Sequence, residues 1–321
     1  MADIKMGEQN TPIEESNNTI EEQNNQIKGQ TTIVEEENVP QPSERIKGLS
    51  SEELKDPNQI SVEIADTRAP IVVLFGPTSC GKTMTLVRLT RYLKKLKHQG
   101  YEVEPIAEFR PTYDKNYAEI CENFNEIIDQ DDAAKGTSKI SFMLVRVRKG
   151  SRTICQILEA PGEYYFNKEV PNSAFPSYFN TIADSNNRKI WMLFVEPGWG
   201  ERNDRTNYVT RISRLKTRMS GKDRVVIVYN KIDKTRFLKD RDGHVDNTKA
   251  LEEINNLYPN LLDEFKNDTP IVRWFTPYKF AYCPFQTGNY SKTDNGSVKY
   301  QPGPEVFPRM LWKIILKKVK G

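Results

Sequence analysis

The feature that most constrains the fold is a short apolar run that leads directly into a glycine-bounded loop. The run IVVLF covers residues 71–75, and the loop GPTSCGKT covers residues 76–83. Glycines let the backbone curl so that several N–H groups point at one anion, and a helix that follows adds its positive N-terminal dipole. The spacing matches the phosphate-binding pattern GxxxxGK[ST] in the context it requires, a strand before and a helix after. The sequence therefore predicts a strand, a phosphate-binding loop and a helix.

Two side chains at the end of this loop have specific chemical roles in such a site. Lys82 can reach the β- and γ-phosphates of a nucleotide, and the Thr83 hydroxyl can ligate Mg²⁺. Cys80 lies near a helix N-terminus, where the pKa of a thiol can fall, but we favour a small residue that fits the loop over a redox switch. The residues expected around the phosphates are Gly76, Pro77, Thr78, Ser79, Cys80, Gly81, Lys82, Thr83 and Met84.

The first 60 residues differ in composition from the rest of the chain. They carry 13 acidic and 5 basic residues, a net charge of −8, whereas the whole chain is +3, so the remainder is +11 (3 minus −8). The segment is rich in Glu, Asn, Gln and Thr, and it cannot bury enough apolar surface to offset the entropy lost on ordering. We predict a disordered acidic tail over residues 1–60 and one α/β domain over residues 61–321.

Several classes of protein are disfavoured by the composition. Four cysteines without CxxC spacing and two histidines give no indication of disulfides or zinc. No apolar run approaches the roughly 18 residues of a membrane span, and the polar start does not resemble a signal peptide. We expect a cytoplasmic protein with no membrane span. No nucleic-acid partner is predicted either, because the arginines of segment 201–218 lack a recognised nucleic-acid module and are expected to form a solvated face.

Strand-like and helix-like segments alternate after the loop. Strands are predicted at 139–147, 153–158, 190–195, 224–229 and within 270–285, and helices at 86–96, 117–128, 201–218, 248–258 and 305–320. This alternation favours a P-loop type α/β fold, a mostly parallel sheet with helices on both faces. The turn at 148–152 predicts a hairpin that adds one antiparallel edge strand. The last helix is expected to dock its apolar stripe on the sheet rather than lie on a membrane.

A second motif follows the predicted strand 153–158. The segment ILEAPGE places Glu159 at a strand end, where a carboxylate beside the phosphate loop can hold Mg²⁺ through its water shell. Gly162 could let a backbone N–H approach a γ-phosphate. The pattern is short, so an ordinary strand-to-loop turn stays open as an alternative.

A third motif, NKID at residues 230–233, follows the predicted strand 224–229. The Asp233 carboxylate has two acceptor oxygens, which can take both the ring N–H and the exocyclic amine of guanine, and adenine offers no such pair of donors. Asn230 can bridge the base-binding loop to the phosphate loop, and the stem of Lys231 can lie along the purine face.

With these three motifs in this order, residues 70–320 resemble the translation-factor-related (TRAFAC) class of P-loop GTPases, and they are similar to the double-GTPase families of bacterial conflict systems. The resemblance implies a guanine nucleotide (GTP or GDP) and Mg²⁺ as cofactors. It implies a first switch whose threonine is Thr137, with Thr112 as the alternative. It implies a second switch that runs from Glu159 into an aromatic loop at 164–179, which either forms a partner surface or, as we favour, packs on its own helix. The metal ligands it implies are Thr83, Thr137 and Glu159, and the catalytic residues are Lys82, Thr137, Gly162 and Glu163.

Three positions depart from the family pattern. Glu159 stands where the family usually has Asp, and Glu163 stands where Ras-like members carry a water-orienting glutamine. The last base-contacting motif is not evident, although segment 282–288 occupies its place. We therefore expect a GTP-binding and GTP-hydrolysing switch that has a protein effector, activator or paired GTPase. The alternatives are an ATPase that uses Glu196 and a scaffold that binds GTP without hydrolysing it.

Overall fold

The structure is a computed structural model that describes residues 49–110, 115–129, 142–240, 242–292 and 298–320. All of them belong to one compact unit that spans residues 40–321. Residues 51–55 form the short helix α2 (Ser51–Lys55), and Leu49 and Ile60 are buried in the core. The tail predicted over residues 1–60 is therefore too long at its C-terminal end. Residues 1–48, Thr112 and Thr137 lie outside the described residues.

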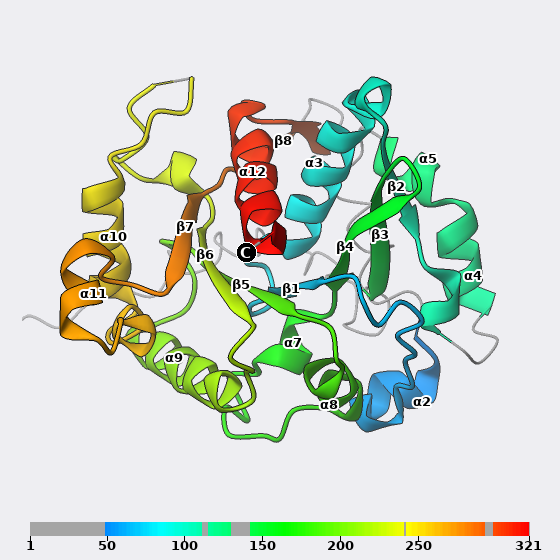
Figure 1. Ribbon diagram of the computed structural model, residues 1–321, viewed down its shortest axis with the longest axis horizontal. Coiled ribbons are helices and arrows are strands. Elements are labelled where there is room, and N and C mark those ends of the chain that lie inside the picture. The colour runs from blue at the N-terminus through cyan, green and yellow to red at the C-terminus, as the bar shows by residue number, and fades with distance from the viewer. Residues whose placement is uncertain (1–48, 111–114, 130–141, 241, 293–297, 321) are drawn as a thin grey trace, which may run out of the picture. The chain divides into compact units, whose positions relative to one another are not determined.

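A seven-stranded sheet forms the centre of this unit (Figure 1). Its strands are β1 (Ile71–Phe75), β2 (Tyr101–Pro105), β3 (Met143–Lys149), β4 (Arg152–Glu159), β5 (Lys189–Val195), β6 (Arg224–Tyr229) and β7 (Phe280–Pro284), in the order β2-β3-β4-β1-β5-β6-β7. The pairs β4–β1, β1–β5, β5–β6 and β6–β7 are parallel. The predicted fold class, a mostly parallel α/β sheet, is confirmed.

The antiparallel part of the sheet differs from the prediction in one detail. The hairpin β3–β4 forms as expected, but β3 is not at the edge, because β2 pairs with it in antiparallel register. The sequence of β2 gives only a weak strand signal, because two of its five residues are glutamates. Glu102 is exposed and Glu104 is half-exposed. A five-residue strand at a sheet edge needs few apolar positions, so its composition resembles that of a loop.

Helices cover both faces of the sheet. Helices were predicted at the positions of α3 (Lys82–Lys95), α9 (Arg202–Thr217), α10 (Asn247–Leu257) and α12 (Val306–Lys320), whereas the single helix predicted at 117–128 is divided into α4 (Lys115–Glu122) and α5 (Phe124–Asp129). Four further helices were not predicted: α2, α7 (Gly162–Tyr165), α8 (Ser177–Asp184) and α11 (Pro270–Phe275). In Figure 1, α3 and α12 lie on one face, and α7, α8 and α9 lie on the other. A separate two-stranded sheet pairs β8 (Asn289–Lys292) with β9 (Val298–Gln301).

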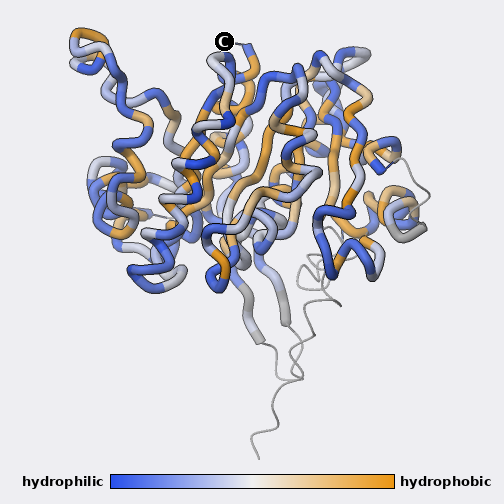
Figure 2. The backbone as a smooth tube through the Cα atoms, turned by 90° about the horizontal axis from the view of Figure 1, so that it is seen from below, coloured by the Kyte–Doolittle hydropathy of each residue, from blue (hydrophilic) through white to orange (hydrophobic). Residues whose placement is uncertain are grey.

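The core runs along the central strands and the helices packed on them. Every residue of β1 and β5 is buried, as expected of parallel strands that are covered on both faces. Figure 2 shows the central strands as mainly apolar. On α12, Phe307, Leu311 and Ile315 are buried in the core, which confirms that this helix docks on the sheet. Within the described part of the chain, we find no helix with both the length and the apolar character that crossing a bilayer requires.

Candidate functional site

The site lies at the edge of the sheet where the parallel strands end. The three motifs follow β1, β4 and β6, and segment 285–288 follows β7. Because these strands are parallel, the four loops emerge at the same edge, which is where ligands bind in open α/β sheets. The sheet topology alone therefore brings together segments that are separated by up to about 200 residues in the sequence.

The glycine-bounded loop curls back on itself at the start of α3. Gly81 has φ +89°, and a Cβ atom there would lie 2.1 Å from Asn230 Nδ2 and 3.0 Å from Thr287 Cγ2. Only glycine fits this combination of a left-handed backbone and close neighbours. The Lys82 side chain is buried, and its Nζ donates to the main-chain oxygen of Pro77 at 3.0 Å. The ammonium group is thereby held inside the curl of the loop.

The second motif contacts the loop through a buried hydrogen bond. Thr83 Oγ1 donates to Glu159 Oε1 at 2.7 Å, and the other carboxylate oxygen, although buried, has no hydrogen-bond partner among the described residues. Burial raises the pKa of Glu159 to about 7, against the opposing effects of the Lys82 charge and the Thr83 hydrogen bond. A hydroxyl and a carboxylate with a spare oxygen form a suitable donor set for a hard divalent cation such as Mg²⁺. No cluster of three or more His, Cys, Asp or Glu side chains suited to a metal occurs among the described residues.

The two residues at the start of α7 lie directly against the loop. A Cβ atom on Gly162 would lie 2.3 Å from the amide nitrogen of Thr78 and 2.4 Å from the carbonyl carbon of Pro77, so the two backbones are in contact. Glu163 Oε2 accepts a hydrogen bond from Thr78 Oγ1 at 3.0 Å. A cavity of about 300 Å³ lies beside this contact, bordered by Trp199 of the loop after β5.

The third motif is tied to the same loop. Asn230 is buried, and its Nδ2 donates to the main-chain oxygen of Cys80 at 2.7 Å. Lys231 Nζ donates to the main-chain oxygen of Ser79 at 3.2 Å and forms an ion pair with Glu196. Asp233 follows in the short 3-10 turn η4 (Ile232–Lys234), and its Oδ1 atom is buried without a hydrogen-bond partner among the described residues. This arrangement leaves a carboxylate oxygen available for an external donor.

The segment after β7, to which the sequence assigned no contacts, completes this edge. The Ile232 amide donates to the main-chain oxygen of Phe285 at 3.1 Å, and Thr287 lies next to Gly81. Arg88 of α3 is buried and donates to the main-chain oxygens of Gln286, Gly303 (2.6 Å) and Pro304 (2.9 Å). Burial lowers the pKa of Arg88. These contacts use backbone oxygens, so no side-chain motif in the sequence indicates them.

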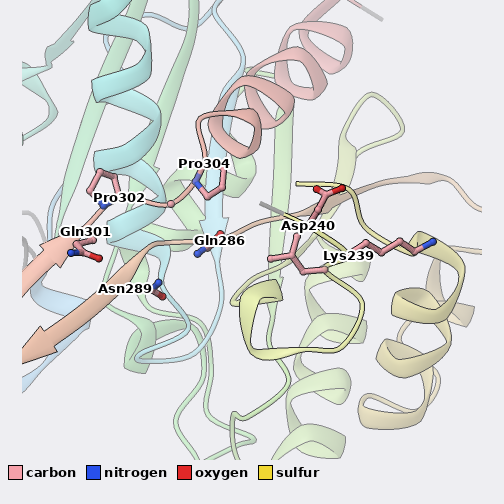
Figure 3. A pocket seen from close by; sticks show the side chains of 9 residues that line it. Lys239, Asp240, Gln286, Asn289, Gln301, Pro302 and Pro304 are labelled. Carbon is pink, nitrogen blue, oxygen red and sulfur yellow. The ribbon is translucent and has the colours of Figure 1, made fainter. Parts of the chain in front are cut away.

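A cavity of about 650 Å³ adjoins this segment. It is lined by Leu238, Lys239, Asp240, Gln286, Asn289, Gln301, Pro302, Gly303 and Pro304. Figure 3 shows Gln286 near its centre, between Asn289 and Gln301 on one side and Lys239 and Asp240 on the other.

Some predicted residues lie elsewhere or act differently. Thr137 and its alternative Thr112 are outside the described residues. Met84 follows Thr83 but is buried against Tyr300 of β9. The aromatic residues after Glu163 are packed inside the molecule as favoured, and the buried ones are Tyr165, Phe166, Tyr178 and Phe179.

The expectation of a solvated arginine face on α9 is wrong for two residues. Arg211 is buried and donates to main-chain oxygens of Tyr165, Ser173 and Ala174. Arg205 donates to the main-chain oxygens of Trp199 and Pro197, at 2.8 and 3.2 Å. Both arginines therefore hold loops at this side of the sheet, and the charge pattern of the helix alone gave no sign of it.

Comparison with protein-family models gives no match for this sequence. Comparison with curated protein sequences likewise gives none. Among solved structures, it is similar to a candidate nucleolar GTP-binding protein 1 of Plasmodium falciparum, with a TM-score of 0.38 and 12% identity over 81% of this chain and 92% of that chain. It is also similar to the GTPase-like domain of S. cerevisiae Ski7 bound to GTP, with a TM-score of 0.39 and 17% identity over 81% of this chain. For GDP-bound aIF5B of Aeropyrum pernix, the TM-score is 0.32 and the identity is 16% over 68% of this chain. The chain spans 53% of the Ski7 structure and 33% of the aIF5B structure. Likenesses of this size carry no argument about function.

Proposed function

We propose that this protein is a TRAFAC-class GTPase, a switch that binds GTP and hydrolyses it with Mg²⁺. The observation that carries the proposal is the hydrogen bond from Asn230 to the main-chain oxygen of Cys80. It joins a base-binding motif to a phosphate-binding loop, so that a base at Asp233 and phosphates at Lys82 can belong to one nucleotide.

Guanine is the base that suits the free carboxylate oxygen of Asp233. A buried acceptor without a donor is costly, and a ligand that supplies N–H groups relieves that cost. The N1–H and the exocyclic amine of guanine supply two such groups, whereas the corresponding edge of adenine does not. The ion pair between Lys231 and Glu196 supports the same choice, because the ATPase alternative requires Glu196 to act at the metal or on water.

Thr83 and Glu159 would hold Mg²⁺ between them and the phosphates. The ion would supply charge neutralisation at the β- and γ-phosphates. For this role Glu159 must be ionised, and a bound cation would favour that form against the burial that raises its pKa. Thr137 is proposed as a further ligand from the first switch.

Hydrolysis requires an ordered water on the far side of the γ-phosphate. Among the described residues, Glu163 is the best placed to orient that water, because it reaches the loop at Thr78. The contact between Gly162 and the loop at residues 77–78 would have to open to admit a γ-phosphate, which gives the α7 segment two positions and thus a switch. We expect slow intrinsic turnover and stimulation by a protein partner, since an arginine supplied in trans raises such rates by roughly 10³–10⁵.

The first test measures nucleotide affinity and single-turnover phosphate release in parallel. Lys82→Ala should abolish release and weaken GTP binding at least about tenfold, because one charge-assisted phosphate contact is lost. The matched control is Lys97→Ala, an exposed lysine just beyond α3, which should behave as wild type. Release undiminished in Lys82→Ala would refute the assignment. Tight GTP binding without release, in wild type and with Mg²⁺ present, would leave only the scaffold alternative.

The second test changes the base preference. Asp233→Asn should weaken GTP binding and improve XTP binding, because xanthine offers an acceptor where guanine has its amine. Asp242→Asn, an exposed aspartate in the same region, serves as the control. Unchanged base preference in Asp233→Asn would contradict guanine recognition by this residue.

A further inference from the structure

Helix α11 exposes a group of large apolar side chains. Ile271, Trp274 and Phe275 are 74%, 89% and 84% exposed, and Val272 beside them is 46% exposed. Apart from Val170, these are all the large apolar side chains that are strongly exposed in the described part of the chain. Their clustering within five consecutive residues differs from the scattered exposure of ordinary surfaces and indicates a binding surface.

The chain presents this group at the tip of a projecting segment. A bridge between Lys266 and Tyr278 closes the base of the segment, and the Asn267 amide donates to the main-chain oxygen of Pro277 at 2.9 Å. Figure 2 shows the segment reaching out at the upper left with an apolar tip, on the same side as the C-terminal end of α12. Because α11 precedes β7, the tip lies at the edge where the parallel strands begin, opposite the nucleotide site.

A row of cations follows the same edge. Arg152 begins β4, Arg68 precedes β1, Arg188 precedes β5 and Lys222 precedes β6, which are consecutive strands in the sheet order. All four side chains line one cavity of about 660 Å³, in which Asp66 is the sole carboxylate. The last turn of α12 adds Lys317, Lys318 and Lys320, and Val319 between them lines the same cavity.

The carboxylates near this row are engaged. Asp66 accepts hydrogen bonds from the amides of Arg68 and Ala69, both at 3.0 Å. Asp223 is buried and accepts from the Lys189 amide and Trp191 Nε1. Asp184 pairs with Arg218. The edge therefore presents a strongly positive surface beside an apolar tip.

We propose that this edge docks on an anionic lipid bilayer, with Trp274 and Phe275 inserted at the interface and the cations over the headgroups. Tryptophan and phenylalanine at a loop tip are suited to the boundary between headgroups and acyl chains. Each basic residue near an anionic surface strengthens binding about fivefold. A basic patch therefore adds a second attachment to the weak one that a small apolar tip provides. Residues 1–48 carry an excess of acidic side chains that matches the cations but have few apolar side chains to cover the tip, so a lipid surface accounts for both features.

Docking by this edge would leave the nucleotide site facing away from the bilayer, because the two lie at opposite ends of the parallel strands. Membrane docking does not depend on the nucleotide chemistry. The protein could bind GTP without binding vesicles, or bind vesicles without binding GTP, so the two failures are distinguishable.

Co-sedimentation of the full chain with vesicles tests the proposal. We expect binding to phosphatidylcholine vesicles with about one-third phosphatidylglycerol, and at least about tenfold weaker binding to phosphatidylcholine alone. Trp274→Ala with Phe275→Ala should weaken binding at least about tenfold. Arg152→Glu and Lys222→Glu, each made singly, should weaken binding at least about fivefold, whereas the charge-matched control Lys249→Glu, an exposed lysine near the start of α10 at the nucleotide edge, should not.

Tryptophan fluorescence reports the insertion directly. Trp191, Trp199 and Trp312 are buried, so Trp274 is the exposed one of the four tryptophans. Its emission should shift to shorter wavelength on anionic vesicles and be quenched by brominated lipids, and Trp274→Phe should remove the shift while preserving sedimentation. Equal binding of wild type and the Trp274→Ala, Phe275→Ala variant would overturn the proposal. A failure to bind vesicles would also overturn it, as would a blue shift that arises only from self-association or a protein partner.

Discussion

Arg211 Nε on α9 donates a hydrogen bond to the main-chain oxygen of Tyr165 at 2.7 Å, at the end of the α7 segment that contacts the phosphate loop. The same guanidinium lies 3.6 Å from the centre of the Phe175 ring. Burial lowers the pKa of Arg211 to about 10, so the group is still charged at neutral pH. A single buried cation thus holds both ends of the segment from 165 to 175 against α9.

Replacing Arg211 should release this segment. We expect Arg211→Ala to lower the free energy of unfolding by about 2–4 kcal/mol, because buried carbonyl groups lose a charged donor and a cavity is left. Hydrogen exchange of the amides in 165–175 should accelerate more than that of β5. Arg202→Ala is the matched control, since Arg202 is an exposed arginine of the same helix. An equal loss of stability in both variants would contradict the specific role of Arg211.

The positions of the central elements could be predicted from the sequence because their residues carry their own signal. The run at β1 is wholly apolar, and the residues after β1 and β6 belong to motifs with fixed spacing, so the strands that precede Lys82 and Asn230 were predicted in place. What could not be predicted depends on the backbone or on tertiary packing. Thr287 lies next to Gly81 because of where the chain runs after β7, and no sequence motif marks it. The burial of Arg211 likewise depends on the path of a loop that is distant in the sequence.

Gly162→Ala should destabilise the protein and push α7 away from the phosphate loop. The new Cβ would meet backbone atoms of Pro77 and Thr78 within 2.6 Å, which neither segment can avoid by a side-chain rotation. We expect a loss of about 1–3 kcal/mol in urea unfolding, the usual cost of overpacking. Gly221→Ala has open space around the new methyl group and should change stability by less than about 0.5 kcal/mol. Similar values for the two variants would show that the contact is looser than described.

The four thiols should be unreactive in the native protein. Burial raises the pKa of Cys80 and Cys121 to about 11 and that of Cys155 to about 12, and it also raises the pKa of Cys283. At pH 8, a shift of two units lowers the thiolate fraction about 100-fold. Reaction with a chromogenic disulfide should therefore be at least that much slower than in urea, with the half-buried Cys121 reacting first. Preferential reaction of Cys80 would revive the redox-switch alternative.

Glu159→Gln should stabilise the metal-free protein above neutral pH and weaken its Mg²⁺-dependent nucleotide binding. A carboxyl group whose pKa rises from 4.5 to about 7 on folding holds its proton more tightly when folded, so its ionisation lowers stability as the pH rises between these values. Above pH 7 the loss is complete and amounts to at most about 3.5 kcal/mol, since one pKa unit corresponds to about 1.4 kcal/mol. Glutamine keeps the acceptor for Thr83 and has no charge to bury.

Thermal unfolding in EDTA at pH 5 and pH 8 measures this difference. The variant should match wild type within about 1 kcal/mol at pH 5 and exceed it at pH 8, whereas Glu163→Gln, a partly exposed neighbour, should show no such gain. Added Mg²⁺ with nucleotide should reverse the order at pH 8, because the cation requires the carboxylate that the variant lacks. Parallel stability curves for wild type and Glu159→Gln across this range would mean that Glu159 is not a desolvated carboxylate, and the metal role assigned to it would lose its physical basis.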